Sequence, residues 1–302
     1  MLIHLFGASS SVGLALQLIA AKRSVDFTFA PYSRVADSIL EGDCAFDLNS
    51  PLAFKPAGEI GAPSIWINFA PIWLFATFFD FISRSRPEFL HGLNGLIACS
   101  SSSAITKRFS ANSFDRELVE RLTSAEDQLL QACGLLHVPC TILQPSMIYG
   151  QVGSLGDRNV SRLIQLMRRA PCLPLPAQSG LRQPIHASQL AAVTLHLAEH
   201  MVVASRDFSL PHRIALGGDS TLSYAEMMLA LQQAQPPGDA ARHCRLLPLP
   251  NRLFFSLATP LLFRSPKAFE AILRMGANLS GFTPAHQLLG REPQPFPVLP
   301  LA

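Results

Sequence analysis

The stretch LIHLFGASSSVG, residues 2–13, decides the fold of this chain. A short apolar run breaks into a turn of glycine and serine and leads directly into the apolar, helix-prone residues 14–21. Such a turn can cradle a phosphate, because backbone N–H groups and the helix dipole face the anion while small side chains let it approach. The spacing is G-x-x-S-x-x-G, with Ser10 at the middle small position. A tight strand–helix turn without a ligand has the same pattern, and this alternative stays open.

The bulk composition excludes several classes of protein. A chain of 302 residues with 49% hydrophobic residues can build one large α/β domain, or a nucleotide domain with a smaller partner. The 24 basic and 21 acidic residues are too balanced to indicate nucleic-acid binding. Six cysteines without a CxxC pair indicate reduced thiols and a cytoplasmic protein. Neither a G-x-S-x-G elbow nor a metal-ligand spacing is present, so we expect no serine hydrolase and no metal site.

Two apolar stretches raise the question of a membrane. Residues 64–82 contain Asn68, Pro71 and Asp80, which favour a buried strand, a turn and a packed helix over a spanning segment. Residues 253–263 are interrupted by Pro260. The first 20 residues lack the positive region of a signal peptide. We expect both stretches to be ordinary core, and peripheral membrane contact is the less favoured alternative.

Strands and helices alternate through the first half of the chain. Apolar runs at residues 25–31, 45–48, 65–69, 93–98 and 138–143 predict strands, and the periodicity of residues 114–133 predicts a helix. This alternation indicates a parallel, doubly wound sheet. Arg34 lies 21 residues after Gly13, where a dinucleotide fold meets the adenosine ribose, so Ser33 and Arg34 favour the 2′-phosphate of NADP(H) over NAD(H). Asp47 and Leu48 would then touch adenine, and Ala70 would let the dinucleotide pass close.

The second half has a different texture. Residues 159–169 predict an amphipathic helix, residues 171–176 a proline-rich turn, and residues 188–199 and 266–276 two further helices. Residues 213–217 can return a strand to the sheet. Ser223 and Glu226 have the S-x-x-E spacing of a capping box. We therefore expect a dinucleotide-binding domain over residues 1–150, completed by about 183–218, and a substrate-binding lobe over 151–182 and 219–302.

Five segments together resemble the extended short-chain dehydrogenase/reductase superfamily, most closely its NAD-dependent epimerase/dehydratase branch. They are Gly7 to Gly13, Phe69-Ala70-Pro71, Cys99-Ser100-Ser101-Ser102, residues 143–150 (LQPSMIYG), and residues 182–186 (RQPIH). The resemblance runs from Leu2 to about Phe296. It implies an α/β fold, a Rossmann-type doubly wound parallel sheet with a small, irregular C-terminal substrate-binding lobe. It also implies a small-molecule substrate, often a nucleotide sugar, and is compatible with a homodimer.

The resemblance assigns roles to individual positions. Ser102 would hydrogen-bond the reacting hydroxyl or carbonyl, and the turn at residues 145–148 would line the nicotinamide. Arg182, and Arg274 as a second clamp, would grip a substrate diphosphate through the guanidinium fork; structural salt bridges are the alternative for both. Asn159 and His186 complete the expected substrate contacts. The expected cofactor contacts are Gly7, Ser9, Ser10, Ser11, Val12, Gly13, Ser33, Arg34, Asp47, Leu48, Phe69, Ala70, Pro71, Ser100, Ser101, Pro145, Ser146, Met147 and Ile148.

The chain departs from the family at its acid/base pair. The family places a tyrosine and a lysine four residues apart on the helix after the serine strand, and the alignment puts Leu118 and Leu122 there. No tyrosine lies between Tyr32 and Tyr149, and leucine cannot transfer a proton. Lys107, five residues after Ser102, is the best substitute by position. Tyr149 and His186 are further candidates, and Lys107 as a solvated surface lysine is the structural alternative.

Three hypotheses follow from this departure. The protein is an atypical NAD(P)-dependent oxidoreductase or epimerase with a substitute acid/base. Alternatively, it has kept the dinucleotide and lost the chemistry, as a sensor or structural subunit. In the third hypothesis it is a sterol- or lipid-directed dehydrogenase, which the two apolar stretches described above would indicate.

Overall fold

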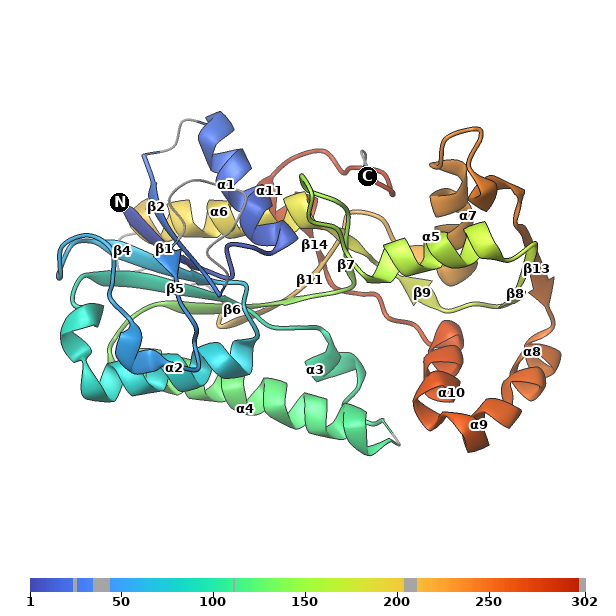
Figure 1. Cartoon of the computed structure of the whole chain (residues 1–302), viewed down its shortest axis with the longest axis horizontal. Helices are drawn as coiled ribbons and strands as arrows, with labels where there is room; N and C mark the ends of the chain where they lie inside the picture. Colours follow the sequence, from blue (N-terminus) through green and yellow to red (C-terminus); the bar gives the residue numbers. More distant parts are fainter. Residues whose placement is uncertain (24–25, 35–43, 111, 204–210, 299–302) are drawn as a thin grey trace.

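The protein is built around one twisted sheet of eight parallel strands, flanked by helices (Figure 1). The computed structural model describes residues 1–23, 26–34, 44–110, 112–203 and 211–298. The strand order is β14-β11-β6-β5-β4-β1-β2-β3, so the chain builds outward from β1 on one side and then crosses to β4 on the other. The strands are β1 (Leu2–Phe6), β2 (Thr28–Ser33), β3 (Cys44–Ala45), β4 (Ser64–Asn68), β5 (Leu93–Cys99), β6 (Cys140–Pro145), β11 (Arg213–Gly217) and β14 (Thr283–Pro284). The predicted parallel, doubly wound sheet is confirmed.

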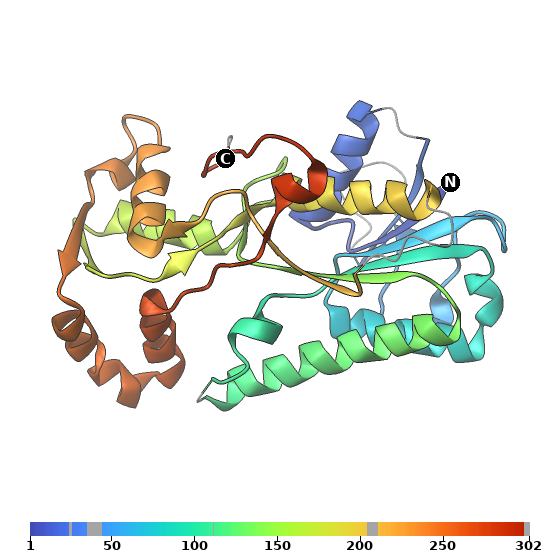
Figure 2. The ribbon, with the colours of Figure 1, turned by 180° about the vertical axis from the view of Figure 1, so that it is seen from behind.

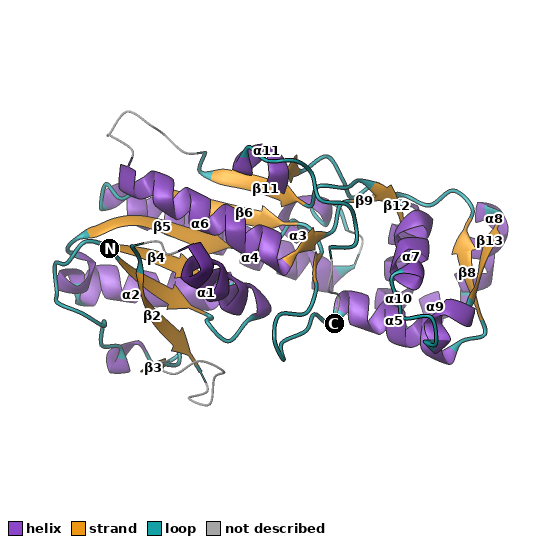
Figure 3. Ribbon diagram, turned by 90° about the horizontal axis from the view of Figure 1, so that it is seen from above, coloured by secondary structure: helices purple, strands orange, loops and turns teal. Residues whose placement is uncertain are grey.

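Helices cover both faces of the sheet (Figures 1 and 3). The helices α1 (Ser11–Arg23), α6 (Ala187–Val203) and α11 (Ala285–Leu289) share a core with one face. The helices α2 (Ile72–Ser85) and α4 (Ser113–Leu135) pack on the other face. Burial on both faces explains why the central strands read as continuous apolar runs instead of alternating patterns.

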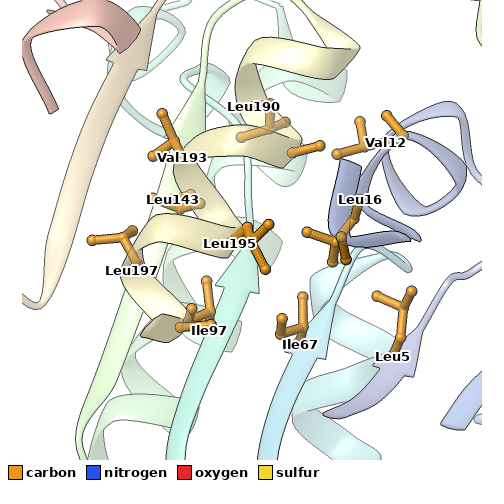
Figure 4. Packing of buried hydrophobic residues seen from close by; sticks show 14 of the residues in the cluster. Leu5, Val12, Leu16, Ile67, Ile97, Leu143, Leu190, Val193, Leu195 and Leu197 are labelled. Atoms are coloured by element: carbon orange, nitrogen blue, oxygen red, sulfur yellow. The ribbon is translucent and has the colours of Figure 1, made fainter. Parts of the chain in front are cut away.

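The two cores differ in chemistry. On the α1/α6 side, aliphatic side chains from four central strands meet those of both helices (Figure 4); they include Leu5, Ile67, Ile97, Leu143, Leu16 and Leu195. On the α2/α4 side, the core is aromatic, with Phe6, Trp66, Phe75 and Phe78 all fully buried. Residues 64–82 are therefore a buried strand, a turn and a packed helix, as predicted.

A second lobe extends from the carboxyl ends of the strands (Figure 2). It contains α5 (Asn159–Arg169), α7 (Tyr224–Gln233) and a two-stranded parallel sheet of β8 (Cys172–Pro176) and β13 (Arg245–Leu249). Three helices follow, α8 (Asn251–Ala258), α9 (Pro260–Arg264) and α10 (Pro266–Leu273). The capping box at the start of α7 is confirmed, because Ser223 Oγ accepts from the Glu226 N–H and the Glu226 carboxylate accepts from the Ser223 N–H.

The remaining elements are short strands, one short helix and several 3₁₀ turns. They are α3 (Ser103–Thr106), β7 (Ile148–Tyr149), β9 (Leu181–Arg182), β10 (Ile185–His186), β12 (Leu222–Ser223), and the 3₁₀ turns η1 (Pro51–Ala53), η2 (Pro87–Leu90), η3 (Ala240–His243) and η4 (Arg274–Gly276). The strand β7 pairs with β10, and β9 pairs with β12. No helix in the described ranges is long and apolar enough to cross a bilayer.

Two expectations for the second half are wrong. Residues 171–176 form the strand β8 instead of a turn; proline is tolerated there because both strands of a two-stranded sheet are edges. Residues 253–263 are also not ordinary core. Phe254 and Ala258 are buried, but Leu257 and Phe263 are 65% and 88% exposed.

Candidate functional site

A pocket of about 540 Å³ opens at the carboxyl ends of β1, β2 and β4. This is the point where the strand order reverses, which is where open α/β sheets bind their ligands. The pocket brings together ten of the predicted cofactor residues: Gly7, Ser9, Ser10, Ser33, Arg34, Asp47, Leu48, Phe69, Ala70 and Pro71. Its remaining lining residues, absent from the prediction, are Phe6, Tyr32, Phe46, Asn49, Leu74 and Arg158.

Gly7 forms the tightest part of the pocket wall. Its φ is +77°, in the left-handed region, and a Cβ at this position would lie 2.5 Å from the Ala70 nitrogen. A Cβ on Gly13 would lie 2.7 Å from the carbonyl oxygens of both Gly7 and Ala8. The middle serine is compatible with the turn because Ser10 Oγ accepts from the Gly13 N–H at 3.0 Å. The turn after β1 is therefore packed closely against backbone, and Gly7, Ser9 and Ser10 of this turn line the pocket, an arrangement that suits a phosphate cradle.

Two arginines give the pocket a positive rim. Arg34 follows β2, and Arg158 comes from the loop before α5 in the second lobe; both are exposed. Asp47 is the acidic residue in the lining, and hydrogen bonds from the Asn49 backbone and side chain hold its pKa below the usual value. Within the described residues, Arg34 makes no ion pair. Its guanidinium is thus available for an anionic ligand.

A buried polar pair lies beneath the pocket. Tyr32 Oη accepts from the Ala57 N–H at 2.9 Å and lies 3.0 Å from His4 Nδ1. The Tyr32 hydroxyl can then donate to His4, which fixes the neutral ring with its proton on Nε2. Burial lowers the pKa of His4 to about 4. This pair anchors β1 to β2 under the cradle.

The serine cluster after β5 does not act as one group. Ser100 Oγ donates to Glu126 at 2.5 Å, and Ser101 Oγ accepts from the Ser103 N–H. The Ser102 N–H donates to the Pro145 carbonyl at 2.9 Å, which joins the cluster to the predicted nicotinamide turn. The Ser102 side chain is buried, and its hydroxyl has no hydrogen-bond partner among the described residues. Of these three serines, Ser102 is the one whose hydroxyl makes no hydrogen bond among the described residues.

The other residues of the predicted nicotinamide region make hydrogen bonds within the protein. Ser146 Oγ donates to the Gln183 carbonyl, and Ile148 pairs with Ile185 between β7 and β10. These residues, with Met147, lie outside the lining of the pocket around Gly7. The same holds for Ser11, Val12, Gly13, Ser100, Ser101 and Pro145.

Glu126 joins four elements at the carboxyl-end side of the sheet. Its buried carboxylate accepts from Ser100 after β5, from Gln144 on β6 at 2.9 Å, and from Arg213 on β11 at 2.9 Å. Because every partner comes from a different strand or its end, Glu126 ties α4 to the sheet. Gln144 thus pairs directly with the glutamate of this helix.

Lys107 belongs to an ionic cluster between the lobes. Its Nζ donates to Asp115 Oδ1 at 2.8 Å, and Arg274 of the second lobe also donates to Asp115. Ser110 donates to Glu270 on α10, which forms a second link between the lobes. Burial opposes ionisation of Asp115, but hydrogen bonds from Lys107, Asn112 and Arg274 hold its pKa well below the usual range. Lys107 is thus an ion-paired residue, not a freely solvated one.

The other predicted substrate residues have structural contacts. The guanidinium of Arg182 is buried and donates to the carbonyls of Leu181, Ala277 and Arg274. The Asn159 N–H donates to Asp157 at 2.7 Å, at the exposed start of α5.

Tyr149 and His186 lie against each other, with ring centroids 5.2 Å apart. Tyr149 Oη accepts from the Val298 N–H at 2.9 Å, and burial raises the pKa of this phenol. His186 Nδ1 lies 2.7 Å from Ser188 Oγ, while its Nε2 is buried beside Gly150 without a partner among the described residues. Burial lowers the pKa of His186.

Leu118 and Leu122, the positions to which the resemblance assigns an acid/base pair, have apolar surroundings in the structure. Leu122 is buried in the aromatic core beneath the sheet, and Leu118 packs against the same core. Neither side chain can carry a proton, and the core that surrounds them holds no tyrosine other than Tyr32, beneath the pocket, among the described residues.

Solved structures with the same architecture are numerous. The protein gox2253 aligns over 97% of this chain and 94% of its own, with a TM-score of 0.65 and 16% identity. UDP-glucuronic acid 4-epimerase from Bacillus cereus, in complex with NAD, aligns over the same shares with a TM-score of 0.63 and 14% identity. GDP-mannoheptose C4 reductase from Campylobacter jejuni, with NADP bound, covers 82% of this chain and 87% of its own at a TM-score of 0.59 and 13% identity.

The chain has the fold of these epimerases and reductases. The fold expected from the resemblance to the extended short-chain dehydrogenases/reductases is thus confirmed. No family model and no curated protein matches the sequence. At these identities the likeness concerns the fold, and the chemistry has to be argued from this chain's own residues.

Of the six pocket residues that were not predicted, Arg158 comes from the second half of the chain. Its loop folds back from the second lobe: Val152 packs against the α1/α6 core, and Gly153 approaches Leu14 on α1. No local sequence pattern predicts that this loop packs on α1, because Gly153 and Leu14 are about 140 positions apart in the chain.

Proposed function

We propose that this protein binds NADP(H) in the pocket around Gly7 and acts as an atypical oxidoreductase or epimerase. The observation that carries the proposal is the cradle itself, in which Gly7 approaches the backbone of Ala70 too closely for any side chain. The helix N-terminus of α1 and the small lining residues fit a diphosphate. The neighbours with this fold that bind NAD or NADP support the same cofactor class.

Arg34 supports a preference for NADP(H). It stands at the pocket rim immediately after β2, where a dinucleotide fold meets the ribose, and its guanidinium makes no described ion pair. A guanidinium can bind a 2′-phosphate in a bidentate manner. Arg158 adds a second positive charge from the second lobe. The position that would hold an acidic residue in a protein that prefers the free ribose of NAD(H) is occupied by Arg34.

The proposed substrate is a nucleotide-sugar-like hydroxyl or carbonyl compound that binds between the two lobes, with the second lobe as its binding domain. A bound nicotinamide would supply hydride exchange with the substrate carbon. Ser102, whose hydroxyl has no hydrogen-bond partner among the described residues, would hydrogen-bond the reacting oxygen. Lys107 would transfer the proton, directly or through water, while its ion pair with Asp115 orients the side chain.

Turnover measurements test this proposal. The protein is mixed with NADPH or NADP⁺ and a panel of UDP- and GDP-sugars and their keto forms. Nicotinamide absorbance reports net oxidation or reduction, and chromatography of the sugars reports epimerisation, which returns the hydride and leaves the absorbance unchanged. We expect turnover with at least one substrate, lost in Ser102→Ala and reduced in Lys107→Ala. The control is Lys55→Ala, because Lys55 is an exposed lysine distant in sequence from Ser102 and Lys107. Mass spectrometry of molecules that co-purify with the protein guides the choice of panel.

A non-catalytic NADP(H)-binding protein is the second candidate. The observation in its favour is the apolar packing of Leu118 and Leu122, which leaves the usual acid/base positions without a titratable group. Bound NADP(H) that is never consumed, and whose retention is unchanged by Ser102→Ala and Lys107→Ala, would favour this candidate over the enzyme.

A further inference from the structure

The helix α8 of the second lobe has two apolar stripes, and one of them faces away from the protein. Phe254 and Ala258 lie four residues apart and are buried. Leu253 and Leu257 have the same spacing about 100° around the helix, on an adjacent face, and are exposed. Phe263 on the neighbouring helix α9 is 88% exposed. Exposed leucine and phenylalanine side chains on neighbouring helices are a candidate interaction site.

The Rossmann half also has exposed aromatic side chains. Phe109, in the turn after α3, is 94% exposed, and Phe114, in the first turn of α4, is 67% exposed. The ion pair between Asp115 and Arg274 holds the start of α4 against the end of α10. The views from front and back both place α9 and the N-terminal end of α4 along one edge of the molecule (Figures 1 and 2). We call Phe109, Phe114, Leu253, Leu257 and Phe263 the apolar edge.

The segment that carries α8 and α9 is basic, and the acidic residue that follows it, Glu270, is paired with Arg274. Residues 240–269 contain five basic residues and no acidic one. Arg252 and Arg264 are exposed and flank the outward face of α8 and α9. On the other lobe, Arg108 stacks over the Phe109 ring at 5.8 Å. Exposed leucine and phenylalanine between arginines is the composition of segments that lie in the interface of anionic bilayers.

We propose that the apolar edge docks the protein peripherally on an anionic lipid bilayer, a property beyond its proposed chemistry. Leu257 and Phe263 would enter the boundary between headgroups and acyl chains, and Arg252 and Arg264 would contact lipid phosphates. The opposite signs of the basic segment and the anionic headgroups favour a bilayer over a second copy of this chain, because two copies would bring arginines against arginines.

Vesicle flotation of the full chain tests the proposal. Vesicles of phosphatidylcholine are compared with vesicles that also contain phosphatidylglycerol, at low and high salt. We expect partitioning to the anionic vesicles at least about tenfold stronger than to phosphatidylcholine alone, and weaker at high salt. In Leu257→Glu/Phe263→Glu, we expect partitioning to fall at least about tenfold.

The matched control is Leu52→Glu/Ile60→Glu, which places the same charges on two apolar side chains that are 70% and 57% exposed elsewhere. The control should bind vesicles like the unaltered chain. Three results would overturn the proposal: no binding to anionic vesicles, equal losses in both double variants, or light scattering that shows a dimer broken by Leu257→Glu/Phe263→Glu. Circular dichroism confirms that each variant is folded, since all four side chains are on the surface.

Discussion

Gly7→Ala probes the cradle directly, because the structure gives two separate reasons for a glycine there. The φ of Gly7 is +77°, and a Cβ would lie 2.5 Å from the Ala70 nitrogen and 2.7 Å from the Phe69 carbonyl carbon. The left-handed backbone costs an L-residue about 1–2 kcal/mol. Overpacking against backbone adds about 1–3 kcal/mol. We therefore expect a loss of about 2–5 kcal/mol in the free energy of unfolding.

Gly61→Ala separates the two contributions. Gly61 has φ +89°, and nothing lies within 4 Å of the place that a Cβ would take there. Only the backbone cost of about 1–2 kcal/mol applies at this position. Urea unfolding of both variants gives the difference in unfolding free energy, and titration with NADPH measures the pocket. We expect Gly61→Ala to bind NADPH normally and Gly7→Ala to bind it far more weakly.

The steric part of this reasoning fails if Gly7→Ala costs no more stability than Gly61→Ala. The functional part fails if Gly7→Ala unfolds more easily but binds NADPH as well as the unaltered chain. In that case the close approach of the turn to Ala70 would serve folding alone.

Three further predictions concern single side chains. Arg34→Ala removes one charged contact worth about 1.5–3 kcal/mol, so the Kd for NADPH should rise about 10- to 150-fold while that for NADH changes little; equal losses would refute the 2′-phosphate assignment. Burial lowers the pKa of His4 to about 4 from its ordinary value of 6.5. The neutral His4 ring therefore contributes its full share of the unfolding free energy above about pH 6.5. This share is lost as the pH falls toward 4, with a slope of up to about 1.4 kcal/mol per pH unit. Urea midpoints at several pH values should show this slope and should lose it in His4→Gln. Glu126→Leu leaves Ser100 and Gln144 without this acceptor, while Arg213 keeps Asp127, and should cost about 1–3 kcal/mol of unfolding free energy; no measurable loss would mean that water replaces the carboxylate.

The features that could be predicted well are local ones. The alternation of apolar runs with helical patterns located most strands of the sheet, and the S-x-x-E spacing located the cap of α7. Asn159–Arg169 and Arg213–Gly217 coincide with predicted elements. Each of these patterns depends on residues close together in the chain, where spacing reports directly on geometry.

The features that escaped prediction depend on distant partners. The proline-rich segment 171–176 becomes the strand β8 because β13 pairs with it from more than 70 positions away. Arg182 was expected to face a diphosphate, and its present carbonyl partners include residues 274 and 277. The helix α8 carries apolar side chains on two adjacent faces, so composition could not tell its buried stripe from its exposed one.

Fluorescence titration with NADPH and NADH tests the central claim most directly. The pocket around Gly7, with Arg34 and Arg158 at its rim, predicts saturable binding of both cofactors and tighter binding of NADPH. Failure of the folded protein to bind either one would contradict both proposed functions and would leave the G-x-x-S-x-x-G turn as a tight strand–helix connection.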